Sequence, residues 1–174
     1  MRSLIFIFMF PFFSKLAFTQ DTAYEDERDS NKYITVQIGN LHWFQENLRY
    51  QFNNGNDTLI NESNCGVFYK VQEAFNACPQ GWRLPTEKEV RALIKEEKKG
   101  RLNLRDTLNI VLCGRIDYEN YEKAGEQNTF WLDAELEDGH ITHWHTFGTE
   151  NEIHSHNVIN ARRKFPVRCV QTFD

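Results

Sequence analysis

The sequence predicts an α+β domain, in which two helices lie between groups of antiparallel strands. Residues 33–38 alternate and are rich in β-branched side chains, and the turn pair Gly39-Asn40 separates them from a second apolar segment at 41–44. This pattern is typical of a β-hairpin. Apolar residues then follow helical spacing between residues 70 and 98, and strand-like segments return after residue 129. Separate groups of strands and helices favour the α+β class.

The composition is that of one ordinary globular domain and disfavours some classes of partner. The chain has 174 residues, of which 40% are hydrophobic and 14% aromatic, enough for a packed core. Its formal net charge is −5, and this becomes −7 when Arg2 and Lys15 are removed with the leader. Such a balance disfavours sequence-independent binding to nucleic acid or to an anionic membrane surface, so we expect neither partner.

Residues 1–19 are predicted to be a secretory signal peptide. Arg2 provides a short positive region, and the apolar run at 4–13 is too short to span a bilayer as a helix. Ala17 and Thr19 are small residues at the positions that favour cleavage before Gln20. We expect a secreted, periplasmic or cell-surface location without membrane insertion after cleavage; the alternative is an uncleaved membrane anchor.

The mature chain is expected to open with an acidic lead-in at 20–31 and to fold as a single domain at 32–174. The lead-in is polar, which predicts a short exposed segment. The hairpin at 33–44 then opens the domain. Residues 51–64 are dense in Asn, Asp and Gly, which indicates an exposed loop.

The first helix is predicted over residues 70–78. Val71, Ala74, Phe75 and Cys78 follow i, i+3, i+4, i+7 spacing, which places them on one helical face. The following Pro-Gln-Gly sequence ends this helix.

The second helix is predicted to begin with a capping box formed by Thr86 and Glu89. Val90, Leu93 and Ile94 form its buried stripe, and the charged run at 95–99 is expected to be a solvent-exposed helix face.

Beyond Gly100 the helical pattern ends. Residues 102–110 are expected to form a strand or an irregular connection, and residues 115–127 a long loop. Four strands are then predicted, at 129–134, 140–147, 152–159 and 165–170. The chain carries four cysteines: Cys65, Cys78, Cys113 and Cys169. An exported protein can form disulfides, and four cysteines allow three pairings, between which the sequence does not decide.

Several strings along the chain carry a family resemblance. They are Ile38-Gly39-Asn40, Trp43, Glu46-Asn47-Leu48, Gly66-Val67-Phe68-Tyr69, Glu73-Ala74-Phe75-Asn76-Ala77-Cys78-Pro79, Gly81-Trp82-Arg83-Leu84-Pro85-Thr86 and Val167-Arg168-Cys169-Val170. In this order they resemble the Fibrobacter succinogenes major paralogous domain, a secreted bacterial module, from about residue 32 to 171. The resemblance implies a fold similar to C-type lectin-like domains and to the formylglycine-generating enzyme, but no established activity.

The resemblance also implies a disulfide arrangement. In a lectin-like fold the first helix is tied to the last strand, which pairs Cys78 with Cys169 and leaves Cys65 with Cys113. The chain departs from the family at Trp131-Leu132-Asp133-Ala134 and in its terminal hairpin, where histidines replace alternating aromatic residues. It lacks the Glu-Pro-Asn or Gln-Pro-Asp triplet of calcium-dependent lectins, so sugar binding by that mechanism is not supported.

Four histidines in the terminal hairpin are candidate metal ligands. His143 and His145 flank Trp144, and His154 and His156 flank a serine, so each pair shares a strand face. A four-residue loop at 148–151 would place His145 opposite His154 and His143 opposite His156. Four imidazoles on one face could bind zinc or copper. The alternative is a set of polar surface residues that bind no metal.

The sequence therefore favours a monomeric extracellular binding module whose partner is a glycan or a protein. Trp144, His143 and His145 are its candidate ligand-binding residues. No catalytic residue or cofactor is predicted. The alternative functions are a metal-binding protein that uses the four-histidine face and a degenerate relative of the formylglycine-generating enzyme. That enzyme needs two positioned thiols, whereas the cysteines here are better explained as disulfides.

Overall fold

The computed structural model describes residues 22–52, 58–60, 65–133, 140–148, 150–157 and 162–172. The predicted signal peptide lies outside these residues, as does much of the predicted loop at 51–64. The described strands form three sheets, and the strands within each sheet are antiparallel. Three helices accompany them within the described part of the chain. The predicted α+β class is confirmed.

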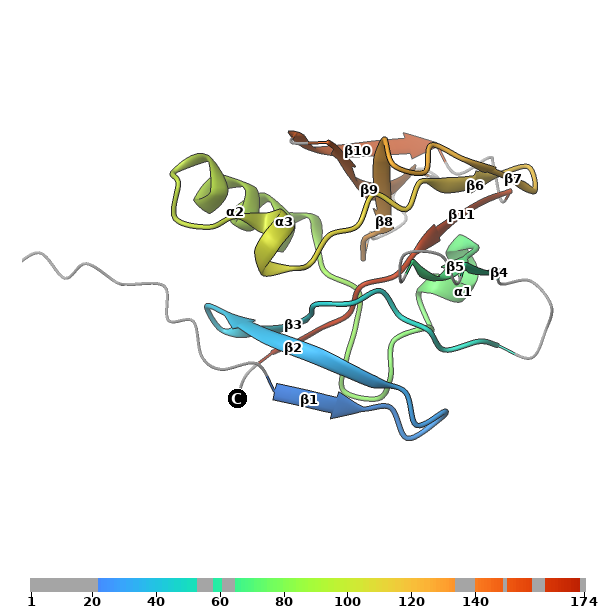
Figure 1. Cartoon of the computed structure of the whole chain (residues 1–174), viewed down its shortest axis with the longest axis horizontal. Coiled ribbons are helices and arrows are strands. Elements are labelled where there is room, and N and C mark those ends of the chain that lie inside the picture. Colours follow the sequence, from blue (N-terminus) through green and yellow to red (C-terminus); the bar gives the residue numbers. More distant parts are fainter. Residues whose placement is uncertain are drawn as a thin grey trace, which may run out of the picture.

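The first sheet has the order β1-β2-β3-β12 and joins the N-terminal strands to the end of the chain (Figure 1). Its strands are β1 (Thr22–Glu25), β2 (Lys32–Ile38), β3 (Leu41–Phe44) and β12 (Val170–Thr172). The hairpin of β2 and β3 is the predicted one, and its register pairs Ile38 with Leu41.

The second sheet has the order β4-β5-β11-β6-β7, and the third has the order β10-β9-β8. The strands of the second sheet are β4 (Thr58–Ile60), β5 (Gly66–Tyr69), β6 (Arg115–Asp117), β7 (Asn120–Glu122) and β11 (Arg163–Pro166). Those of the third are β8 (Gln127–Trp131), β9 (His140–Phe147) and β10 (Glu150–Asn157). The predicted strand at 165–170 is therefore two strands in two sheets, and residues 167–169 cross between them.

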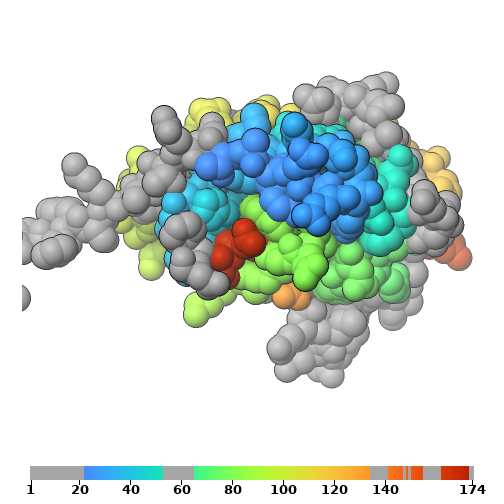
Figure 2. Space-filling view, turned by 90° about the horizontal axis from the view of Figure 1, so that it is seen from below, coloured from blue at the N-terminus to red at the C-terminus, as the bar shows by residue number. Residues whose placement is uncertain are grey.

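The lead-in predicted at 20–31 is mostly exposed where the structure describes it, as expected, but these residues are also part of the fold. β1 pairs with β2 at the edge of the first sheet, and Tyr24 packs against Phe44 and Trp82. Asp26 is fully buried and forms an ion pair with Arg28 at 2.7 Å. Figure 2 shows this N-terminal segment, in blue, against the green segment that contains Trp82. The strand is short and polar because it lies at an edge, so it lacks the hydrophobic alternation that sequence reasoning needs.

The helix α2 (Glu87–Lys98) begins as predicted, with Thr86 and Glu89 in a reciprocal capping box. Its buried residues are Val90 and Leu93, and Ile94 packs at the edge of the core. The first helix, α1 (Val71–Ala74), is much shorter than the predicted 70–78, and Phe75 is partly exposed. The chain turns after Ala74 towards Cys78, whose disulfide fixes its position.

A further helix, α3 (Leu104–Thr107), lies within residues 102–110, where a strand or an irregular connection was predicted. Asn103 caps it, because the Asn103 side chain accepts a hydrogen bond from the Asp106 backbone N–H at 3.2 Å. Leu104 is buried at its start.

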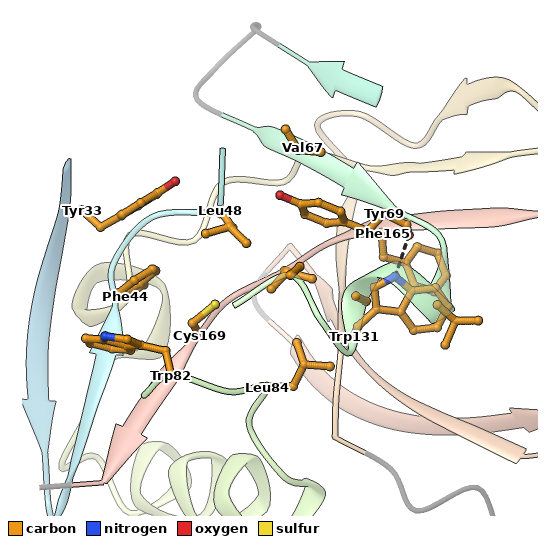
Figure 3. Close-up of a cluster of buried hydrophobic side chains, with 14 of the residues drawn as sticks. Tyr33, Phe44, Leu48, Val67, Tyr69, Trp82, Leu84, Trp131, Phe165 and Cys169 are labelled. Carbon is orange, nitrogen blue, oxygen red and sulfur yellow. Dashed lines mark hydrogen bonds between the residues drawn. The ribbon is translucent and has the colours of Figure 1, made fainter. Parts of the chain in front are cut away.

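One core cluster is rich in aromatic side chains and joins the first sheet to the second. Figure 3 shows Phe44 between Tyr33 and Trp82, with ring centroids 4.6 Å and 4.3 Å away. Trp131 packs on Phe165, and its indole N–H donates to the Tyr69 carbonyl oxygen at 2.8 Å. Large buried aromatic rings of this kind contribute much of the apolar area that stabilises a small domain.

A second core cluster lies under α2. Val90 and Leu93 of the helix share it with Trp43 of β3, Phe130 of β8 and Trp144 of β9. This packing places α2 on one face of the third sheet, which positions the helix beside the β9–β10 hairpin (Figure 1).

The structure contains the Cys78–Cys169 disulfide that the family resemblance implied and the Cys65–Cys113 disulfide that the two remaining cysteines form. Their Cα atoms are 5.8 Å and 5.5 Å apart, within the range of ordinary disulfides. Both are consistent with folding in an oxidising compartment. Among the described helices, none has the length and apolar character that crossing a membrane requires.

Candidate functional site

The β9–β10 hairpin has a different register from the predicted one. Phe147 pairs with Glu150, so the loop has two residues and not four. Gly148 has a φ of +51°, which such tight hairpin loops require. His143 consequently opposes His154, and His145 opposes Glu152. His156 faces Ile141 across the strands, and its side chain lies outside the described residues.

Three imidazoles nevertheless form a compact cluster. The ring centroids of His143 and His145 are 4.6 Å apart, those of His145 and His154 4.9 Å, and those of His143 and His154 6.1 Å. His145 Nδ1 is hydrogen-bonded to Thr129 Oγ1 at 2.9 Å, and His154 Nε2 is hydrogen-bonded to Glu152 Oε2 at 2.8 Å. Within the described part of the chain, no three His, Cys, Asp or Glu side chains are arranged to hold a metal ion.

The imidazole face is buried, which contradicts the expectation that His143 and His145 contact a ligand. Only 3% of His143 and 7% of His145 is exposed, and the His143 ring lies 5.4 Å from that of Phe165. Trp144 on the opposite strand face is fully buried beside Phe130 and the α2 helix. Strand alternation alone could not show that both faces of this sheet are covered.

A hollow in the described surface lies between α2, α3 and the β9–β10 hairpin. It has a volume of about 700 Å³ and continues into an adjoining hollow of about 550 Å³ along α2. Ile94, Lys98, Asn151 and Glu152 line both parts, so we treat them as one groove and call it the α2–β10 groove. Its size is that of ordinary ligand sites.

The floor of the α2–β10 groove is apolar, and its walls are polar. Ile94, Leu102, Ile110 and Leu112 form the floor of the larger part. The walls carry amide, hydroxyl, carboxylate, ammonium and guanidinium groups. They come from Glu97, Lys98, Asn103, Arg105, Thr146, Glu150, Asn151 and Glu152.

Hydrogen bonds hold the walls of the groove in place. Glu97 accepts from the Asn151 side-chain amide at 2.5 Å and from the Leu104 backbone N–H at 3.0 Å, so it joins α2 to β10 and α3. Arg105 donates to the Gly148 carbonyl oxygen at 3.3 Å. These contacts fix the three elements relative to one another before a ligand arrives, which reduces the entropy cost of binding.

The α2 wall of the smaller part is basic. Its four cationic residues are Arg91, Lys95, Lys98 and Lys99. Across from them, β10 contributes the half-buried Ile153 and the partly exposed His154. Sequence reasoning treated this charged run as a solvent-exposed helix face. The i, i+4, i+7 spacing of Arg91, Lys95 and Lys98 places the three cations on one side of the helix, and this is the signal that could have identified the wall.

Comparison of the chain with protein-family models, with curated proteins and with solved structures finds no match. The α2–β10 groove and the imidazole cluster are therefore interpreted from their own geometry.

Proposed function

We propose that the protein is an exported binding module of C-type lectin-like fold that binds a glycan in the α2–β10 groove. The observation that carries this proposal is the groove itself, a hollow of about 700 Å³ with an apolar floor and walls held by hydrogen bonds. A protein ligand is the alternative partner, and no catalytic role is proposed.

The groove lining suits a sugar chain. Sugar rings present apolar C–H faces, for which Ile94, Ile110 and Leu112 provide a surface. Sugar hydroxyls both donate and accept hydrogen bonds, and the walls offer acceptors at Glu150 and donors at Arg105 and Lys98. A few polar groups over an apolar surface are the usual composition of a ligand site.

The lectin-like part of the proposal rests on element order and on one disulfide. A hairpin, helices and later antiparallel strands follow one another along the chain, and β12 returns beside β3. Cys78, just after α1, is joined to Cys169, just before β12. Together with the family resemblance of the sequence strings, these features support the assignment. Export is supported by the two disulfides and by the predicted signal peptide.

A glycan array with the folded protein, residues 20–174, tests the proposal, followed by calorimetry on any sugar that is retained. Binding should persist in EDTA, since the chain lacks the calcium-binding triplet of lectins. Leu112→Trp, which fills the groove, should weaken binding at least tenfold. Ile34→Trp is the matched control, because the Ile34 side chain of β2 is exposed and lies outside the groove. This variant should leave binding unchanged. Absence of glycan binding, or equal binding by the Leu112→Trp variant, would contradict the proposal.

The imidazole cluster favours a second candidate function, a zinc or copper site at His143, His145 and His154. The specific observation is that three rings pack together with centroid separations of 4.6–6.1 Å, although their present arrangement does not hold a metal ion. Metal binding requires the His154 ring to leave Glu152 and turn towards the other two. Calorimetry with Zn²⁺ and Cu²⁺ tests this candidate: micromolar binding that His143→Ala and His154→Ala abolish supports it, and absence of heat excludes it.

A further inference from the structure

We propose that the ligand of the α2–β10 groove is an acidic oligosaccharide, whose sugar units carry carboxylate groups. This inference rests on the proposed glycan-binding function and specifies the class of sugar. It is carried by the uneven distribution of charge along the groove.

Two ammonium groups of the groove have no anionic partner within the described part of the chain. Lys95 and Lys98 are exposed and form no ion pair there, whereas Arg91 is paired with Glu87 at 2.5 Å and Lys99 with Glu96 at 2.7 Å. Lys95 and Lys98 therefore give the smaller part of the groove a local positive charge, although the whole chain has a net charge of −5. A ligand carboxylate beside them would supply the missing partner.

Carboxylates line the other part of the groove and help to identify the ligand. Glu150 of β10 lines the larger part alone, and Glu152 lines both parts; their carboxylates can accept hydrogen bonds from hydroxyl groups. An acidic peptide, with a negative charge on most residues, would be repelled there. A chain of uronic acids presents two or three hydroxyl groups for each carboxylate, so it can satisfy both parts of the groove. The charge pattern thus favours an acidic sugar over an acidic peptide.

The proposal is tested by calorimetry with three ligands of matched length: an oligogalacturonate, its neutral methyl ester and polyglutamate. The oligogalacturonate should bind the folded protein about tenfold more tightly than the ester, as expected for two exposed charge pairs. Raising the salt concentration should weaken binding of the acid and leave binding of the ester nearly unchanged, because only the ionic contacts are screened.

A matched pair of double variants locates the effect. Lys95→Gln/Lys98→Gln removes the two unpaired charges of the groove and should weaken acid binding about tenfold while ester binding stays constant. Lys88→Gln/Lys123→Gln removes the same number of charges outside the groove and should change neither. Circular dichroism and thermal melting check that both proteins are folded.

The outcomes separate this inference from the proposed function. Equal affinity for acid and ester overturns the inference and leaves the glycan-binding function in place. Polyglutamate binding as tightly as the oligogalacturonate also overturns it, in favour of an acidic protein partner. If neither this pair nor any array glycan binds, both proposals fail. Lower acid affinity in the groove variant but not in its control supports the inference.

Discussion

Arg168 places its guanidinium group in the interior, where no carboxylate of the described residues pairs with it. The group donates to the carbonyl oxygens of Gln45 and Leu108 and, at 2.7 Å, to Asn47 Oδ1. It also lies 5.1 Å from the centroid of the Phe130 ring. Burial lowers the pKa of Arg168, and the hydrogen bonds offset part of the cost of removing the charge from water. One side chain thus links the end of β3, the end of α3 and the approach to β12.

We predict that Arg168→Lys lowers the free energy of unfolding by about 2–4 kcal/mol. Lysine keeps the charge but lacks the planar guanidinium group that donates to three acceptors. Some of the buried oxygens of Gln45, Asn47 and Leu108 would therefore lose their hydrogen-bond donor. Urea unfolding followed by circular dichroism measures the change. Arg101→Lys, at an exposed position, is the control and should be nearly neutral. Equal stability of the two variants would contradict the role assigned to Arg168.

Glu89 makes the start of α2 sensitive to pH. Burial alone would raise the pKa of Glu89, but hydrogen bonds from Arg83 and Thr86 outweigh burial and lower it. A carboxyl whose pKa is lower in the folded state stabilises the protein above its unfolded pKa, about 4.3. That stabilisation is lost as the pH falls through the folded pKa.

Glu89→Gln should therefore lower the free energy of unfolding by about 1 kcal/mol at pH 7 and reduce the further loss between about pH 5 and pH 3. Glutamine keeps the capping geometry, so the difference reports mainly on the charge. Urea unfolding at pH 7, 5 and 3 measures it. Glu27→Gln, on an exposed loop, should retain the pH dependence of the unchanged protein. An unaltered pH dependence in Glu89→Gln would refute the assignment.

At the scale of elements, local signals were sufficient only where both ends of an element are marked in the sequence. α2 was predicted because Thr86 and Glu89 mark its start, a buried stripe follows, and Gly100 marks its end. α1 was overestimated, since apolar spacing does not reveal that the chain turns after Ala74. The β9–β10 register failed for a similar reason: the sequence does not state the loop length, and a two-residue change moves His154 from His145 to His143.

Gly114 is an element-scale constraint at the entry to β6. It has a φ of +70°, and a Cβ atom there would overlap the backbone of Glu122 and Ala124. Gly125 has a φ of +78° but has nothing near its missing Cβ. We predict that Gly125→Ala costs about 1–2 kcal/mol for its backbone conformation and that Gly114→Ala costs at least about 3 kcal/mol. Thermal and urea unfolding compare the two, and similar costs would show that the strand pair shifts easily.

At the scale of the whole molecule, the sequence predicted the fold class but not the candidate site. The α2–β10 groove depends on contacts between distant segments, such as Asn151 with Glu97 and Arg105 with Gly148. Neither contact has a local pattern that predicts it. The predicted ligand-binding residues Trp144, His143 and His145 are buried, because the second core cluster covers one strand face and Phe165 packs against the other.

The two disulfides should contribute unequally to global stability. The Cys78–Cys169 disulfide spans 91 residues and Cys65–Cys113 spans 48. By loop-closure entropy, replacing the first pair with serine should cost about 4–5 kcal/mol and replacing the second about 4 kcal/mol. Urea unfolding of the two double variants measures the difference, and non-reducing peptide mapping verifies the pairing. A Cys65–Cys78 bridge in the map would contradict the structure.

The order of the cysteines has a consequence for proteolysis. The two disulfides interlace along the chain, because Cys78 lies inside the first loop and Cys113 inside the second. A single cut anywhere between Cys65 and Cys169 therefore leaves both fragments covalently joined. Such a nicked protein would migrate as one band on a non-reducing gel and as two after reduction. One proteolytic cut in a loop between Cys65 and Cys169 would therefore not release a fragment.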